Sequence, residues 1–181
     1  MTAAPGGGTQ AAAPAPAGGQ AEPRPRRRAV ALGAVAAVVV AADQLTKSLA
    51  LGHLQLGVPD HVIGPVNLLL TFNRGAAFSL GAGVAPVVEG VAAALVVAVV
   101  LASRRVARRG ASLPLTIGLG LLSGGAVSNL ADRFVRHHHG AVVDFVQLVS
   151  WWPIFNLADA CITVGAVLVA LNLAFAAPER P

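Results

Sequence analysis

The stretch from Leu113 to Leu130, LPLTIGLGLLSGGAVSNL, contains no charged side chain. A helix rises about 1.5 Å per residue, so about 20 residues cross the roughly 30 Å hydrocarbon layer of a membrane, and this stretch is close to that length. Three further apolar stretches carry only one or two charges each: Ala29–Leu51, Val84–Ser103 and Leu157–Ala177. The sequence therefore predicts a mainly α-helical membrane protein with four transmembrane helices.

The composition excludes a water-soluble globule. Of the 181 residues, 55% are hydrophobic and 12% are charged, whereas soluble domains have about 25% charged residues. The mean hydropathy is +0.70. The single cysteine, Cys161, excludes an intramolecular disulfide and a cysteine-rich metal framework, and we expect it to be a small apolar residue of the last span.

Arginine dominates the net charge of +5, and its distribution predicts the orientation in the membrane. Lys47, Arg74, Arg133 and Arg136 fall on one side of the predicted spans, and the other nine cations fall on the opposite side. The positive-inside rule places the side with nine, and with it both termini, in the cytoplasm. No aromatic residues are interleaved with the arginines clustered at residues 24–28 and 104–109, so we expect no nucleic-acid partner. The nine cations on the predicted cytoplasmic side are Arg24, Arg26, Arg27, Arg28, Arg104, Arg105, Arg108, Arg109 and Arg180.

The chain divides into one membrane domain and two tails. Residues 1–28, rich in Ala, Gly and Pro, predict a disordered cytoplasmic tail. The first apolar stretch begins too late for an ordinary cleaved signal peptide, so we expect it to be retained. Residues 29–177 then form the four-helix transmembrane domain, and residues 178–181 form a short cytoplasmic tail.

The outer side collects the polar residues that the composition makes rare. All five aspartates, all five histidines and both tryptophans fall there or at the outer ends of spans. The segment around His61–Phe78 alternates apolar runs with turn residues and predicts a small extracytoplasmic β-sheet. We expect Arg133–Asn156 to lie along the membrane surface as a helix or loop, with Trp151 and Trp152 at the headgroups. His137, His138 and His139 are adjacent, which suits a solvated loop better than a metal site.

Two helical constellations predict braces between elements. Asp43 and Lys47 are four residues apart, so they share a helix face and can pair, with a structural ion pair and a functional role equally open. Asn129, Asp132 and Arg133 line up on one face of the third span, where close packing and a terminal salt bridge are the simplest interpretation. Gly124 and Ser128 just before them have the small-residue spacing of tightly packed membrane helices.

Asp144 and Asp159 form the candidate chemical centre. Both lie in apolar surroundings without a basic neighbour within four residues, so each needs a shared proton or hydrogen-bond donors such as Asn156. Two carboxylates about 4 Å apart repel by roughly 4 kcal/mol at an effective dielectric constant near 20, so one stays protonated. Such a pair suits aspartyl hydrolysis, but spacing alone leaves a proton or ion carrier and a noncatalytic assembly subunit open.

Five ordered blocks make the chain similar to the lipoprotein signal peptidases, also called signal peptidase II. The resemblance covers about residues 29–177 and implies four transmembrane helices, a small extracytoplasmic sheet and a surface helix. It also implies a bacterial inner-membrane aspartic endopeptidase that cleaves signal peptides from prolipoproteins just before a diacylglyceryl-modified cysteine. The blocks are Asp43–Lys47, Asn73–Phe78, Gly124–Arg133, Val142–Phe145 and Phe155–Asp159.

The resemblance also assigns roles, residue by residue. It implies that Asp144 and Asp159 are the catalytic dyad. Substrate binding or dyad orientation falls to Asn73, Gly75, Asn129, Arg133 and Asn156, and support of the site falls to Asp43, Lys47 and Asp132. Lipidated prolipoproteins and membrane lipids are the expected partners of a monomer that uses no cofactor or metal. One departure is Ser128, which stands where the third block usually has glycine; close packing survives a serine there.

Overall fold

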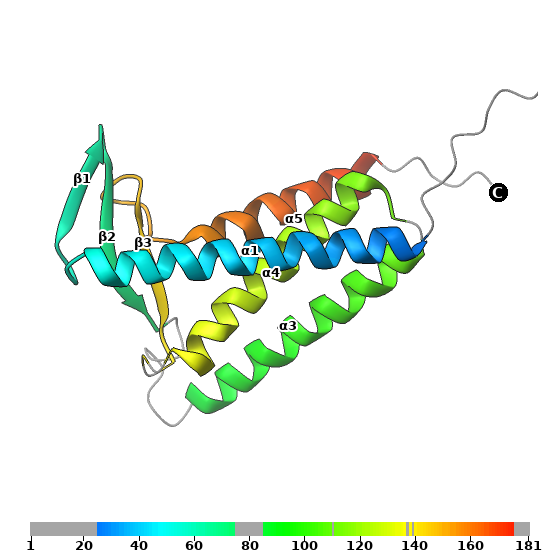
Figure 1. Cartoon of the computed structure of the whole chain (residues 1–181), viewed down its shortest axis with the longest axis horizontal. Coiled ribbons are helices and arrows are strands. Elements are labelled where there is room, and N and C mark those ends of the chain that lie inside the picture. Colours follow the sequence, from blue (N-terminus) through cyan, green and yellow to red (C-terminus); the bar gives the residue numbers. More distant parts are fainter. Residues whose placement is uncertain (1–24, 75–84, 110, 137, 139, 176–181) are drawn as a thin grey trace, which may run out of the picture.

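A bundle of helices with a small sheet at one end forms the described part of the chain in a computed structural model (Figure 1). The structure describes residues 25–74, 85–109, 111–136, 138 and 140–175. Gly75, His137, His139 and the segment 76–78 of the second block lie outside these residues. In chain order the elements are α1 (Pro25–His53), β1 (Pro59–Ile63), β2 (Val66–Asn73), α3 (Ala85–Arg108), α4 (Leu113–Val135), β3 (Val142–Gln147) and α5 (Leu157–Phe175).

Three of the helices are long and apolar enough to cross a membrane: Arg26–His53, Leu113–Val135 and Leu157–Phe175. Their outer faces carry exposed aliphatic side chains; Val38 is 67% and Leu173 is 66% exposed. Such faces are stable in lipid and unfavourable in water. The predicted mainly helical membrane fold with a small sheet is confirmed, with three candidate spans among the described residues.

The first helix begins earlier than the sequence predicted. We expected the disordered tail to reach residue 28, but α1 starts at Pro25 and includes Arg26, Arg27 and Arg28. Proline suits the first turn of a helix, and arginine is a good helix former, so the charged residues extend the helix beyond its apolar part. The last helix ends within the described residues at Phe175.

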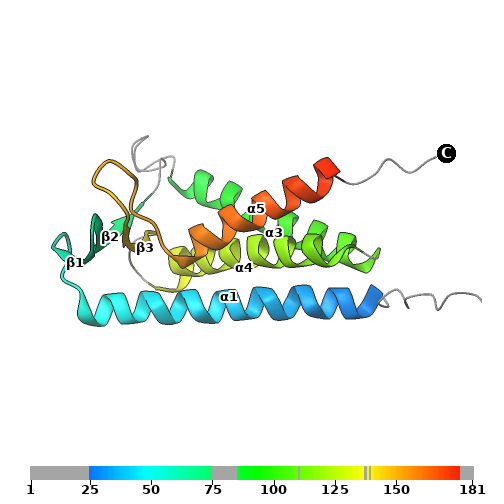
Figure 2. The ribbon, with the colours of Figure 1, turned by 90° about the horizontal axis from the view of Figure 1, so that it is seen from above.

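Helix α4 is the centre of the bundle and packs against α1, α3 and α5 (Figure 2). Its glycines allow the backbones to approach closely. A Cβ atom on Gly124 would lie 2.8 Å from the carbonyl oxygen of Ala36 in α1, and one on Gly125 would lie 2.5 Å from that of Ala158 in α5. The predicted tight packing of this small-residue run is confirmed.

The sheet caps the bundle at the end of α1. Its strands run antiparallel in the order β1-β2-β3, and Gly64, with a φ of +55°, forms the turn between the first two. Ala50 of α1 packs with Leu70, Val143 and Phe145 of the sheet in a buried apolar cluster. The C-terminal end of α1 is therefore fixed to β2 and β3.

One expectation about the outer segments is wrong in part. We expected residues 133–156 to lie along the membrane surface, but Val142–Gln147 form the third strand and residues 141–145 are buried. They are buried because β3 pairs with β2 and supplies Val143 and Phe145 to the apolar cluster against α1. Residues 148–152 are bends and turns at the protein surface without a helix, and Trp151 and Trp152 are 77% and 50% exposed, whereas Phe155 pairs with Val146 and Asn156 is fully buried.

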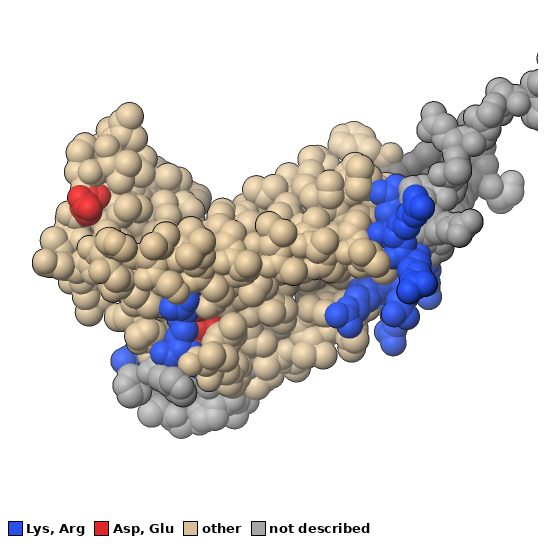
Figure 3. All heavy atoms as spheres, viewed as in Figure 1, with Lys and Arg blue, Asp and Glu red and all other residues tan. Residues whose placement is uncertain are grey.

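The two ends of the bundle differ in charge. Lys and Arg side chains gather at the end opposite the sheet, over the start of α1 and the junction of α3 with α4 (Figure 3). The described members of this cluster are Arg26, Arg27, Arg28, Arg104, Arg105, Arg108 and Arg109. The sheet end carries few charges on the surface in this view.

Candidate active site

The two candidate aspartates come from different elements that meet where the sheet joins the bundle. Asp144 lies on β3, is only 1% exposed, and accepts one hydrogen bond on each oxygen. Asn156 Nδ2 donates to Oδ1 at 2.7 Å, and Asn73 Nδ2 donates to Oδ2 at 2.9 Å. Both donors reach the strand from neighbouring elements, so β2 and the start of α5 together fix this carboxyl group.

The surroundings of Asp144 raise its pKa to about 6 from the ordinary value of 3.8. Burial is the largest cause, because it penalises the charged carboxylate, and the nearby charge of Asp159 acts in the same direction. The hydrogen bonds from Asn73 and Asn156 and the charge of Lys47 oppose the rise. Asp144 therefore ionises much closer to neutral pH than an ordinary aspartate.

Asp159 lies in the first turn of α5 and is partly exposed. Its Oδ1 accepts a hydrogen bond from Asn129 Nδ2 at 2.8 Å, and its Oδ2 accepts one from the backbone N–H of Asn156 at 3.2 Å. Asn156 Oδ1 in turn accepts the backbone N–H of Asp159 at 3.0 Å. This reciprocal pair is a capping box, which holds the carboxylate at the positive end of the helix dipole.

Asn156 joins the two aspartates. Its side chain is fully buried, and its amide nitrogen also lies 3.2 Å from the carbonyl oxygen of Val143 and 3.1 Å from Asn129 Oδ1. One asparagine thus caps the helix that carries Asp159 and donates to the carboxylate of Asp144. The prediction that Asn156 supplies a donor to these carboxylates is confirmed, and it reaches both.

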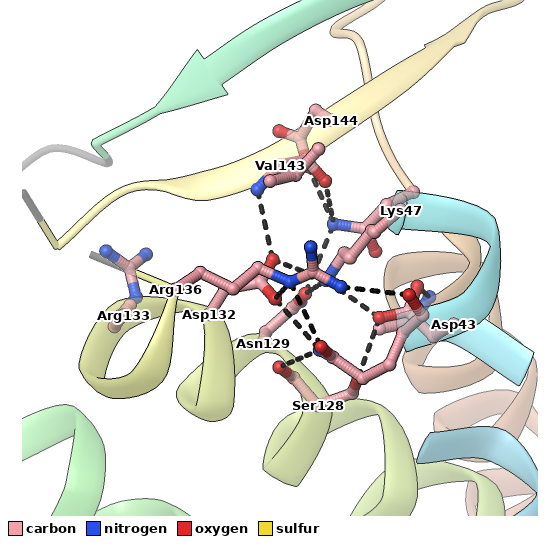
Figure 4. A network of polar contacts seen from close by, with 12 residues as sticks. Asp43, Lys47, Ser128, Asn129, Asp132, Arg133, Arg136, Val143 and Asp144 are labelled. Carbon is pink, nitrogen blue, oxygen red and sulfur yellow. Dashed lines mark hydrogen bonds and ion pairs between the residues drawn. The ribbon is translucent and has the colours of Figure 1, made fainter. Parts of the chain in front are cut away.

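A buried ionic cluster lies beneath the aspartates (Figure 4). The predicted pair of Asp43 and Lys47 is confirmed, with Nζ and Oδ2 2.7 Å apart, and Lys47 Nζ also lies 2.8 Å from Asp132 Oδ2. The third contact of Nζ is Asn129 Oδ1, at 2.8 Å. Lys47, Asp43 and Asp132 are all fully buried, and the lysine joins α1 to α4.

The structure corrects the expectation for Asp132 and Arg133. The terminal salt bridge on α4 joins Asp132 to Arg136, four residues later, with Oδ1 and Nε 3.1 Å apart. Arg133 instead donates to the carbonyl oxygen of Gly140 at 2.8 Å, where it holds the loop before β3. The (i, i+4) spacing of Asp132 and Arg136 is the same signal that predicted the Asp43–Lys47 pair, and it could have found this one.

Two polar residues that the sequence left without a role complete the cluster. The Ser128 hydroxyl donates to Asp43 Oδ2 at 2.7 Å, so the serine that replaces the usual glycine has a partner. Gln44 Nε2 donates to Asp132 Oδ1 at 2.8 Å, and its Oε1 accepts from Arg136 Nε at 3.0 Å. Among the described residues, no buried side-chain nitrogen or oxygen in this cluster or elsewhere lacks a hydrogen-bond partner.

The described residues contain no group of three or more His, Cys, Asp and Glu side chains that could hold a metal ion. What the site does contain is a pair of electrostatically coupled carboxyl groups, one buried and one partly exposed, with amide donors on every oxygen. Coupled carboxyl groups can exchange one proton with water and a peptide carbonyl without a metal.

A pair of coupled carboxyl groups at one end of an apolar helix bundle suits the chemistry of a membrane aspartic peptidase. Residues 35–175 match the sequence profile of the family described as Signal peptidase (SPase) II. The chain belongs to this family, whose members cleave signal peptides from prolipoproteins during lipoprotein maturation.

Curated relatives and a solved structure agree with this assignment. The chain is 45% identical over 141 residues to the lipoprotein signal peptidase of Rhodococcus jostii, an alignment that covers 76% of this chain and 69% of the relative. It is 44% identical over 144 residues to that of Mycolicibacterium smegmatis, covering 77% of this chain and 59% of the relative. A bacterial membrane enzyme solved in meso at 1.9 Å superposes with a TM-score of 0.68 at 28% identity, covering 79% of this chain and 92% of that one.

Proposed function

We propose that Asp144 and Asp159 are the catalytic dyad with which this signal peptidase cuts prolipoproteins just before a diacylglyceryl-modified cysteine. The observation that carries the proposal is their coupling: Asn156 hydrogen-bonds to both, and the charge of Asp159 raises the pKa of Asp144. Two carboxyl groups so placed can share one proton.

The unequal exposure of the two groups assigns their tasks. Asp144 is 1% exposed and its pKa is raised, so it is the group of the pair that holds the shared proton and donates it to the oxygen of the scissile carbonyl. Asp159 is partly exposed, so water can reach its ionised carboxylate, which removes a proton as the water attacks the carbonyl carbon. No metal or cofactor takes part in these steps.

The amides around the dyad orient it. Asn73, Asn129 and Asn156 each donate to an aspartate oxygen, which directs the remaining lone pairs toward substrate and water. Arg133 and Gly75 complete the set that we assign to substrate binding. The substrate's acyl chains stay in the outer leaflet with the membrane lipids, and this remote binding energy positions the peptide bond.

The topology that we propose has four spans in a bacterial inner membrane. Helix α3, with 24 residues, is long enough to be the fourth span beside the three candidates. The arginine-rich end opposite the sheet supports cytoplasmic termini and a dyad at the outer face. Residues 1–24 form the cytoplasmic tail, the bundle and sheet form one peptidase domain that ends near residue 177, and the enzyme works as a monomer.

The experiment is cleavage of a prolipoprotein by the full-length protein in detergent, with product masses determined by mass spectrometry. Two substrates differ only in whether the cysteine carries diacylglycerol. We expect the lipidated substrate to give a product that begins with the modified cysteine, and the unlipidated one to remain intact. Equal cleavage of both, or a cut elsewhere, would contradict the proposed specificity.

A further inference from the structure

Lys47 forms ion pairs with two carboxylates. Each of these carboxylates accepts a hydrogen bond from the backbone N–H of the residue directly before one dyad aspartate. Asp43 Oδ1 accepts the N–H of Ala158, the residue before Asp159, at 2.8 Å. Asp132 Oδ2 accepts the N–H of Val143, the residue before Asp144, at 3.0 Å. The ammonium group of Lys47 lies 2.7 Å from Asp43 and 2.8 Å from Asp132.

We propose that this arrangement of Asp43, Lys47 and Asp132 is a clamp that sets the separation of the two dyad carboxyl groups. One arm runs from Lys47 through Asp43 to the first turn of α5, and the other runs through Asp132 to β3. The inference rests on the proposed function of the dyad and adds what holds its geometry. The clamp residues act through other groups, so they are positioning residues.

The position of the clamp makes it stiff. All three members are fully buried, and the contacts are charge-assisted hydrogen bonds, which are shorter and stronger than neutral ones. Lys47 also donates to Asn129 Oδ1, so the amide nitrogen of Asn129 is turned toward Asp159. The lysine thus orients one dyad donor as well as both backbone segments.

Each arm has a neutral side chain that steadies its carboxylate. Ser128 donates to Asp43 on the Asp159 arm, and Gln44 donates to Asp132 on the Asp144 arm. These side chains allow each arm to be loosened without changing a charge. Removal of Lys47 itself would leave the buried carboxylate of Asp43 without a cation and Asp132 with Arg136 alone, and would disrupt folding, so it does not test the clamp.

Separation of the carboxyl groups controls the pH range of activity, because their repulsion keeps one proton on the pair. If a loosened arm widens a gap of about 4 Å by about 1 Å, the repulsion at an effective dielectric constant near 20 falls by about a fifth, which narrows the whole profile by about half a pH unit. The substitutions leave the surrounding charges in place. The charged residues on the elements packed around the dyad are Asp43, Lys47, Arg74, Asp132, Arg133 and Arg136. His138 and Cys161 are further titratable groups.

The test compares Ser128→Ala and Gln44→Met with Ser123→Ala as the matched control. Ser123 is also buried on α4, and its hydroxyl donates to Ser103 on α3 at 3.1 Å, away from the dyad. We expect kcat to fall about tenfold in each clamp variant, with KM within about twofold of the wild type and a narrower bell-shaped pH profile. The control should lose thermal stability and keep both kcat and the width of the profile.

The clamp is overturned if either variant keeps the wild-type kcat and profile width, or changes them no more than Ser123→Ala does. Loss of thermal stability alone, shared by all three variants, would mean that Ser128 and Gln44 only hold helices together. A wild-type protein that cleaves no lipidated substrate would instead refute the proposed function, so the two failures are distinct.

Discussion

Asn73→Ala should move the alkaline limb of the pH profile of kcat to higher pH. Asn73 Nδ2 donates to Asp144 Oδ2 at 2.9 Å, and this bond lowers the pKa of Asp144 against the effect of burial. A hydrogen bond to a charged group contributes about 1.5–3 kcal/mol, which corresponds to about one to two pKa units. Asn73 is exposed, so the lower end of the range applies, and the pKa of Asp144 should rise from about 6 by about one unit.

The consequence is a change in the share of protein that holds the proton on Asp144. For a single acid at pH 7, a rise from a pKa of about 6 to about 7 changes the protonated share from about a tenth to about a half. The assay is kcat for a lipidated prolipoprotein between about pH 5 and pH 9. The maximal kcat of the variant can fall, because Asn73 also belongs to the proposed substrate contacts. The pH at which kcat declines does not depend on that maximal value.

Asn67→Ala is the control for this measurement. Asn67 lies on the same strand and donates to Gln147 Oε1 at 3.2 Å, away from the dyad. Its alkaline limb should match that of the wild type. An Asn73→Ala limb that stays in place, or that moves to lower pH, would refute the assignment of the proton to Asp144.

Two further predictions concern stability. The native pKa of Asp144 is raised from 3.8 to about 6, which is about two units or about 3 kcal/mol, so the native protein binds the proton more tightly and its stability falls as pH rises through this range. Unfolding in detergent should therefore show a wild-type loss about 3 kcal/mol larger than that of Asp144→Asn between pH 4 and pH 7; parallel curves would contradict it. Gly125→Ala places a Cβ 2.5 Å from the carbonyl oxygen of Ala158 and should destabilise the protein by about 1–3 kcal/mol. In the control Gly33→Ala, the added Cβ meets nothing within 4 Å, so this variant should keep the wild-type stability. Equal melting temperatures of the two variants would refute the packing argument.

Local sequence patterns predicted the features that depend on neighbours along the chain. The starts of α4 at Leu113 and of α5 at Leu157 coincide with the predicted spans, because a change from polar to apolar residues marks both boundaries. The Asp43–Lys47 pair followed from helical spacing alone. The roles of Ser128 and Gln44 did not, because their partners lie on other elements, up to 92 residues away in sequence.

The third strand shows a different limit. Val142–Gln147 is short and apolar, and such a run is buried in a sheet only if a partner strand exists. Its partner, β2, lies more than 70 residues earlier, so no local signal distinguishes the strand from a segment on the membrane surface. The same long-range pairing brings Asn73 to Asp144, which the resemblance suggested and the spacing alone could not.

Cleavage by the dyad variants is the most direct test of the central claim. Wild type, Asp144→Asn, Asp159→Asn and Asp60→Asn are purified in the same detergent and incubated with lipidated prolipoprotein in excess of enzyme. Asp60 lies exposed on β1, outside the site, so its variant should cleave at the wild-type rate. Both dyad variants should be folded and inactive, because each lacks one half of the proton exchange. Cleavage at a rate near that of the wild type by either Asp144→Asn or Asp159→Asn would contradict the account.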